Sequence, residues 1–154
     1  MSYIQNKLED IQYGKKREKQ LLPIINDFLD CNLLPYKNKF SVVDFYDSNE
    51  EIYVELKSRK IPSDNFYKLM IGKNKIDFFK EKLQYGKRCI IIFDYTDYLY
   101  SLELNLEMLK DFSYKQWTRT DRDKNETSMY CFIEKHKFNI IATWLYDIDE
   151  IVLV

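Results

Sequence analysis

Residues 40–58 read FSVVDFYDSNEEIYVELKS and predict two β-strands joined by a polar turn. Apolar residues recur on both sides of the segment 47–50, whose Asp, Ser, Asn and Glu side chains favour a turn. Side chains alternate along a strand, so Tyr53, Glu55 and Lys57 are expected to share one face of the second strand. The stretch therefore predicts a hairpin on which an acid and a lysine are neighbours.

Asp44 stands between Val43 and Phe45 in the first of these strands. A carboxylate within an apolar strand is costly unless its charge is paired or bound to a cation. Folding the chain back at the turn carries Glu55 along the sheet toward Asp44, and Lys57 lies on the same face as Glu55. The hairpin geometry thus permits all three charged side chains to converge.

Asp44, ten intervening residues and Glu55-Leu56-Lys57 resemble the active-site signature of the PD-(D/E)xK nuclease superfamily. That superfamily includes restriction-endonuclease-like and Holliday-junction-resolvase-like enzymes, and the resemblance covers residues 14–100. The residue before Asp44 is Val43 rather than the Pro of the name, which is dispensable in the superfamily. The resemblance implies an α/β (α+β) fold with a restriction-endonuclease-like core, in which helices flank a central mixed β-sheet.

The same resemblance implies a metal-dependent nuclease that hydrolyses phosphodiester bonds, in DNA more than in RNA, leaving a 5′-phosphate and a 3′-hydroxyl. Asp44, Glu55 and the Leu56 carbonyl would hold Mg²⁺ or Mn²⁺, and Lys57 would position the attacking water. Glu18, on a helical segment upstream, matches the additional acid of resolvase-like members. Glu18 also stands within a cluster of basic residues, with which it could simply pair.

Basic residues near the signature are candidates for binding the nucleic-acid backbone. Arg59 and Lys60 follow the second strand almost directly. Residues 73–84 predict an amphipathic helix, and its start offers backbone N–H groups beside Lys73 and Lys75. That combination suits a phosphate group. A lysine-rich helix start that is merely solvated is the alternative.

Hydrophobic periodicity predicts the remaining elements. Two helices are expected before the hairpin, over residues 2–12 and after Gly14, the second kinked or delayed by Pro23. The run at 88–95 predicts a buried strand that, with the preceding helix, completes a strand–helix–strand crossover. Further strands are expected at residues 98–104 and 129–134, a loop at 119–125, and a segment that packs the end of the domain at 138–145.

The length and the net charge of the chain limit its possible domain organisation and function. The 154 residues predict a single domain, 1–154, and the net charge of −1 argues against nucleic-acid binding by bulk attraction alone. Residues 1–90 hold 17 basic and 13 acidic side chains, whereas residues 91–154 hold 7 and 12. The candidate site therefore lies in the more basic part of the chain.

Cysteine and histidine usage makes zinc and a disulfide framework poor interpretations. Cys31, Cys89 and Cys131 are far apart, and His136 is the sole histidine, expected at the surface. The thiols are expected to be buried in a reducing compartment.

No segment reaches the about 18 apolar residues of a membrane span, and the first residues lack the apolar run of a secretory signal. We expect an intracellular protein, in the cytoplasm of a bacterium or of a virus-infected cell; its Lys-, Ile-, Asn- and Tyr-rich composition suits an AT-rich genome.

Two other functions remain open on the sequence. The first is a catalytically silent nucleic-acid-binding module, in which the acids form a salt-bridge network on the same fold. The second is an interaction protein whose acidic C-terminal part meets a partner in a larger complex. A homodimer is a further expectation for a small nuclease that cuts two strands, although no heptad pattern marks a dimer seam.

Overall fold

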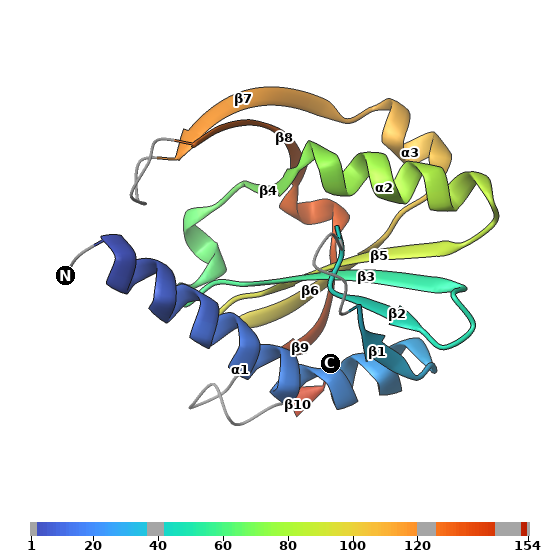
Figure 1. Cartoon of the computed structure of the whole chain (residues 1–154), viewed down its shortest axis with the longest axis horizontal. Coiled ribbons are helices and arrows are strands. Elements are labelled where there is room, and N and C mark those ends of the chain that lie inside the picture. The colour runs from blue at the N-terminus through green and yellow to red at the C-terminus, as the bar shows by residue number, and fades with distance from the viewer. Residues whose placement is uncertain (1–2, 37–41, 120–125, 144–151, 154) are drawn as a thin grey trace.

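A computed structural model describes residues 3–36, 42–119, 126–143 and 152–153 of the chain (Figure 1). The helices are α1 (Tyr3–Leu29), α2 (Lys73–Gln84) and α3 (Leu106–Lys110), with 3₁₀ turns at Ser63–Asn65 and Lys135–Lys137. The strands are β1 (Leu33–Pro35), β2 (Phe45–Asp47), β3 (Ile52–Ser58), β4 (Lys68–Gly72), β5 (Arg88–Asp94), β6 (Tyr98–Glu103), β7 (Ser113–Arg119), β8 (Glu126–Glu134), β9 (Asn139–Thr143) and β10 (Val152–Leu153).

The strands form two sheets. The larger has the order β1-β2-β3-β5-β6-β9-β10, and the smaller has the order β4-β8-β7. Within the larger sheet β3 and β5 run parallel, whereas the other neighbouring strands are antiparallel. The fold is therefore α+β with a mixed central sheet, as the sequence predicts.

The parallel pair β3–β5 requires a crossover, because a tight turn joins only antiparallel strands. The crossover consists of β4 and α2, and α2 buries Ile76 and Phe79. Gly86, at φ 77°, adopts the left-handed conformation just after α2 and turns the chain into β5. The predicted strand–helix–strand unit is confirmed, as are the helix at 73–84 and the strand that follows it.

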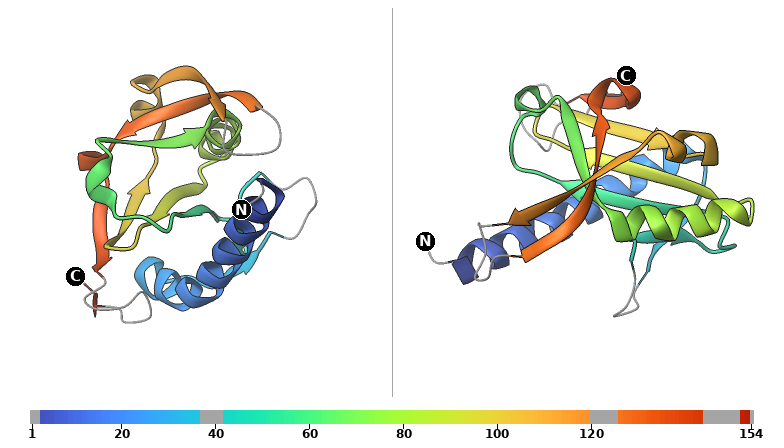
Figure 2. Two further views of the ribbon diagram at one scale, coloured as in Figure 1. Left: turned by 90° about the vertical axis from the view of Figure 1, so that its left-hand side faces the viewer. Right: turned by 90° about the horizontal axis from the view of Figure 1, so that it is seen from above.

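The central sheet packs helices on both faces (Figures 1 and 2). Alternation along the strands produces these two faces. Toward α1 point Ile52, Val54, Ile90 and Ile92, which pack with Leu21, Ile25 and Leu29. Toward α2 and the smaller sheet point Tyr53, Ile91 and Phe93, which pack with Ile76, Phe79, Leu69, Ile71, Cys131 and Ile133. One continuous core thus joins the two sheets, and Glu55 and Lys57 belong to the α2 face of β3.

The prediction of two helices before the hairpin is wrong. α1 is continuous from Tyr3 to Leu29, with Pro23 inside it. Pro23 is exposed, so water can solvate the carbonyl group that loses its intrahelical donor there. The stripe of Leu21, Ile25 and Leu29 is buried on the opposite side, and this burial outweighs the local cost of proline.

The smaller sheet and α3 lie where the sequence predicts little. β7 and α3 fall within residues 105–119, which lack a clear periodicity, and β4 pairs with β8 across about 60 residues of chain. The predicted strands at 98–104 and 129–134 are confirmed as β6 and part of β8. Within the segment predicted at 138–145, β9 buries Ile141 and Ala142 in the core, and residues 144 and 145 lie outside the described residues. The loop predicted at 119–125 lies outside the described residues except for Arg119, which ends β7.

The cysteines and the histidine agree in part with expectation. All three thiols are free, and Cys89 and Cys131 are buried, but Cys31 is half-exposed at the end of α1. His136 is exposed and lies 3.2 Å from a Glu134 oxygen.

Among the described residues, no helix has the length and hydropathy to cross a membrane.

A buried ion pair fastens α1 to the sheet. Arg17 Nε and one terminal nitrogen donate to the two carboxylate oxygens of Asp94 at 2.8 and 3.0 Å. Arg17 and Asp94 are 1% and 0% exposed, respectively. Two-pronged guanidinium–carboxylate geometry is the arrangement that best offsets the cost of desolvating both charges. The pair therefore fixes α1 relative to the end of β5.

We expect Arg17→Met to lower the free energy of unfolding by about 3–5 kcal/mol, because it leaves the buried Asp94 carboxylate without a partner. Urea unfolding followed by circular dichroism measures the loss. Lys16→Met, at an exposed neighbouring position, is the matched control and should change stability little. The double variant Arg17→Met/Asp94→Leu should recover most of the loss, and a single variant as stable as wild type would contradict the structural role of the pair.

Candidate functional site

The predicted hairpin is formed by β2 and β3, and Asp47 closes it. Asp47 Oδ1 accepts hydrogen bonds from the backbone N–H groups of Glu51 and Ile52, at 2.7 and 3.0 Å. Glu50 has φ 56° and completes the turn. The turn fixes the register in which Phe45 pairs with Val54.

This register brings Asp44 next to the segment that follows Val54. Asp44 directly precedes β2, and its Oδ2 accepts a hydrogen bond from the Leu56 N–H at 2.8 Å. The Asp44 carbonyl accepts from the Tyr36 N–H at 2.8 Å, which fixes the backbone on the β1 side. The predicted convergence is confirmed for Asp44 and Glu55, although Asp44 lies just before β2 and not within the strand as predicted.

Glu55 is a buried carboxylate whose charge is only partly offset by hydrogen bonds and by a neighbouring cation. It is 3% exposed and faces the α2 side of the sheet. Its Oε2 lies 3.0 Å from Lys75 Nζ, yet makes no hydrogen bond of normal geometry with any residue that the structure describes. Burial raises the pKa of Glu55 well above its usual value; a side-chain hydrogen bond with Asp44 and the charge of Asp44 raise it further, and Lys75 opposes them. The fold thus holds two carboxyl groups against each other.

Glu18 is a third carboxyl group near this pair. It lies half-buried on α1, and its pKa is raised first by burial and then by the negative charge of Asp44. Lys15 lowers it, so the basic neighbours also act on Glu18. Three elements, namely α1, β3 and the segment before β2, therefore bring acids toward one place.

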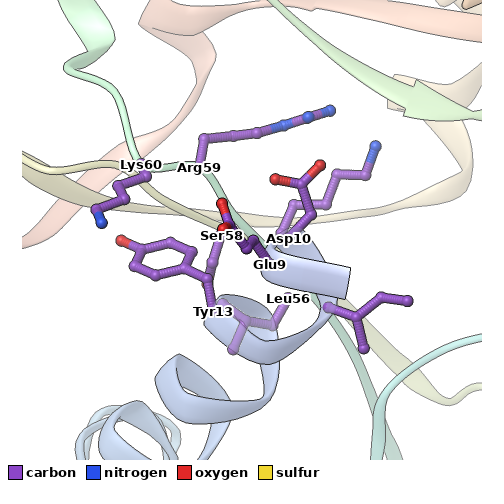
Figure 3. Close-up of a pocket in the computed structure, with 9 residues that line it drawn as sticks. Glu9, Asp10, Tyr13, Leu56, Ser58, Arg59 and Lys60 are labelled. Atoms are coloured by element: carbon purple, nitrogen blue, oxygen red, sulfur yellow. The ribbon is translucent and has the colours of Figure 1, made fainter. Parts of the chain in front are cut away.

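Lys57 and Leu56 line a pocket, whereas Asp44, Glu55 and Glu18 are not among its lining residues. Figure 3 shows the pocket between the beginning of α1 and the end of β3, with Glu9 and Asp10 of α1 among its lining residues. Lys57 is half-buried and lies two residues beyond Glu55 on the same face of β3. The pocket thus places a lysine next to a space open to solvent, where a ligand could reach it.

Arg59 and Lys60 line the same pocket, and Figure 3 shows their side chains extending in different directions. The Arg59 N–H donates to the Asp94 carbonyl at 2.8 Å, which extends the pairing of β3 with β5 by one residue. Lys60 Nζ lies 5.9 Å from the centre of the Tyr13 ring. Both cations are near Lys57, as a role in binding a phosphate backbone requires.

The start of α2 separates its two lysines. Lys73 pairs with Asp77 at 2.8 Å and lies 5.7 Å from the centre of the Tyr114 ring, on the side of β7. Lys75 instead pairs with Glu55 and donates to the Val42 carbonyl. The structure brings Lys75, but not Lys73, to the candidate carboxylates.

The acids have the chemistry of a site for a hard divalent cation. Mg²⁺ and Mn²⁺ prefer oxygen ligands, and Asp44, Glu55 and the Leu56 carbonyl would supply three of them. The buried Oε2 of Glu55, without an aligned hydrogen bond, is an oxygen that a cation would satisfy. Within the described part of the chain, however, no three His, Cys, Asp or Glu side chains are already arranged around a metal position. The acids fit a metal held by two carboxylates, a carbonyl and water.

Sequence reasoning missed the partner of Lys75 and the role of Asp94. Asp94 ends the most continuous apolar run of the chain, so the signal that singles out Asp44, an acid in an apolar strand, applies equally to it. The contact of Lys75 with Glu55 joins elements 20 residues apart and leaves no local signal. Asp10 stands eight residues before Glu18, a same-face spacing in a continuous helix, but the break expected between the two predicted helices hides this signal.

We expect Glu55→Gln to stabilise the protein against unfolding at pH 8 in EDTA. The pKa of Glu55 is higher in the folded than in the unfolded protein, so the folded state loses stability as pH rises from the usual glutamate range to the folded-state pKa. Above that pKa the loss of stability is complete and stays constant. Glutamine avoids this cost, which for a poorly satisfied buried group is about 1–3 kcal/mol.

Thermal or urea unfolding at pH 8 and at pH 4 measures the difference, which should vanish at the acid pH. Glu81→Gln, exposed on α2, is the matched control. A Glu55→Gln protein less stable than wild type at pH 8 would show that the ion pair with Lys75 is a structural bond.

Comparison of the chain with protein-family models, with curated proteins and with solved structures finds no match. The function must therefore be argued from the geometry of these side chains and from the motif that they form.

Proposed function

We propose that this protein is a metal-dependent nuclease that hydrolyses phosphodiester bonds of nucleic acid, with DNA favoured over RNA by the resemblance of its motif. The observation that carries the proposal is the buried Glu55 carboxyl group held against Asp44, with Lys57 next on the same strand face. A carboxyl group whose pKa is raised by burial and by a neighbouring acid, as that of Glu55 is, is typical of functional sites. A solvated salt-bridging face would not bury Glu55.

The order of elements also supports the proposal. A helix bearing Glu18 precedes three antiparallel strands, and the crossover helix α2 leads to β5, which is parallel to β3. This is a central mixed sheet flanked by helices, an arrangement compatible with the core that the motif implies. Glu55 lies on β3, and Asp44 directly precedes the neighbouring strand β2, with its Oδ2 accepting from the Leu56 N–H.

The residues divide the work of hydrolysis. Asp44, Glu55 and the Leu56 carbonyl would hold Mg²⁺ or Mn²⁺, and Glu18 would add a carboxylate beside Asp44. When bound, the cation would polarise the scissile phosphate and lower the pKa of a coordinated water. Lys57, half-buried at the open pocket, orients the attacking water and offsets the charge that develops on the phosphate oxygens.

The remaining cations hold the substrate. Arg59 and Lys60 border the pocket and would bind phosphates on either side of the bond that breaks. The water oxygen bonds to phosphorus as the bond to the 3′ oxygen breaks; the water releases one proton to solvent, and the leaving 3′ oxygen takes one proton from solvent. The expected products are a 5′-phosphate and a 3′-hydroxyl.

A catalytically silent nucleic-acid-binding or complex-forming module is the second candidate. The observation that favours it is the Lys75 ammonium group, which lies 3.0 Å from Glu55 Oε2 and so supplies a cation from the protein itself. Such a module would bind nucleic acid equally well with and without divalent cations, and would not cleave it.

Asp44→Asn tests the metal site directly, because asparagine keeps an oxygen to accept the Leu56 N–H bond but loses the charge. We expect Mn²⁺ binding by calorimetry to be lost and cleavage of a panel of linear, single-stranded and branched DNA and RNA to fall at least ~100-fold. Asp27→Asn, exposed on the same helix as Glu18, is the control and should behave as wild type. Binding of nucleic acid by both proteins without cleavage would favour the silent module.

Lys57→Met should separate chemistry from metal binding. We expect cleavage to fall at least ~100-fold while Mn²⁺ affinity stays at or above that of wild type, since a lysine that acts on the substrate is not a metal ligand. Lys68→Met, exposed on β4, is the matched control. A Lys57→Met protein that cuts at the wild-type rate would remove Lys57 from the mechanism.

A further inference from the structure

From the first turn of α2, Lys75 contacts both β3 and the segment that precedes β2. Its Nζ lies 3.0 Å from Glu55 Oε2 on β3, and it donates to the Val42 carbonyl, two residues before Asp44. The Lys75 side chain is 26% exposed, whereas that of Glu55 is 4% exposed. The ammonium group therefore closes the site from its solvent side, between the segments that carry Asp44 and Glu55.

A divalent cation and this ammonium group compete for one oxygen. Two cations within a few ångströms repel each other strongly in a partly buried site, where the effective dielectric constant is far below that of water. The ammonium group is held by the ion pair with Glu55 Oε2 and by its hydrogen bond to the Val42 carbonyl, so a cation that displaces it must outweigh both contacts. A lysine stem is flexible, and its partial exposure gives Nζ a route to water.

We infer that Lys75 is a built-in counterion that occupies Glu55 in the metal-free protein and that binding of a divalent cation displaces. The inference rests on the proposed function, because it concerns the same metal site. It makes Lys75 a positioning residue that sets metal affinity, and it frees the ammonium group for a phosphate once the metal is bound. Removing the charge of Lys75 should strengthen metal binding, whereas removing a structural support would weaken it.

Lys73 is the natural control for this inference. It stands in the same turn of α2 and has its own carboxylate partner, Asp77, at 2.8 Å, but it lies away from Glu55. Both lysines are therefore ion-paired helix residues with a similar local setting. They differ in whether the partner is a candidate metal ligand.

The test is calorimetric titration of Mn²⁺ into wild type, Lys75→Gln, Lys75→Arg and Lys73→Gln. We expect Lys75→Gln to bind Mn²⁺ at least about tenfold more tightly than wild type, while Lys75→Arg, which keeps the charge, and Lys73→Gln bind as wild type does. Glutamine keeps a donor for the Val42 carbonyl, and Lys75→Met serves as a second uncharged variant if Lys75→Gln fails to unfold cooperatively.

A thermal scan in EDTA gives a readout independent of activity. Lys75→Gln should melt below wild type because Glu55 loses its counterion, and Mn²⁺ should raise its melting temperature by more than it raises that of wild type. Binding by Lys75→Gln when wild type shows none would also support the inference. Equal or weaker binding by Lys75→Gln, with wild type binding Mn²⁺, would overturn the inference and leave the metal site intact. Absence of Mn²⁺ binding by every variant would overturn both.

Discussion

The parallel hydrogen-bond ladder between β3 and β5 is the constraint on which the rest of the structure depends. A parallel pair cannot be joined by a tight turn, so the chain must leave the sheet and return through β4 and α2. That excursion places the first turn of α2 over β3, where Lys75 meets Glu55. The other end of the ladder presents Asp94, to which Arg17 fastens α1, and α1 in turn carries Glu18.

The two faces of this ladder differ in how well their buried carboxylates are paired. On the α1 face, Arg17 satisfies Asp94 with two hydrogen bonds, which is the arrangement expected of a structural ion pair. On the α2 face, Glu55 is almost as well buried but lies against another acid, Asp44, and its one cation is poorly aligned. The same fold builds a complete pair and an incomplete one a few residues apart. The incomplete pair therefore keeps an acceptor oxygen at which a bound cation would add stability.

The sequence predicts what depends on short-range periodicity. The hairpin, its alternation, α2, β5 and β6 all follow from patterns within about ten residues, and so does the meeting of Asp44 with Glu55 across the turn. Prediction from the sequence fails where contacts between distant parts of the chain determine the structure. α1 continues through Pro23 because the core beneath it outweighs local propensity, and β4 enters a second sheet because it pairs with β8. The contact of Lys75 with Glu55 is also between distant parts of the chain. Helical spacing predicts the face of α2 on which Lys75 lies, but it does not predict which residue packs against that face.

Burial and a neighbouring acid raise the pKa of two acids of the candidate site. For Glu55, burial is the largest cause, followed by the side-chain hydrogen bond and the charge of Asp44, and Lys75 opposes them. For Glu18, burial again comes first and the charge of Asp44 second, and Lys15 opposes them. Each of these two acids thus has a lysine that favours its charged form, and in both cases burial and Asp44 outweigh that lysine. A divalent cation bound at Asp44 and Glu55 would match the charges of both carboxylates, whereas the single charge of Lys75 matches only one, and this difference is the electrostatic ground for the proposed exchange of Lys75 for a metal.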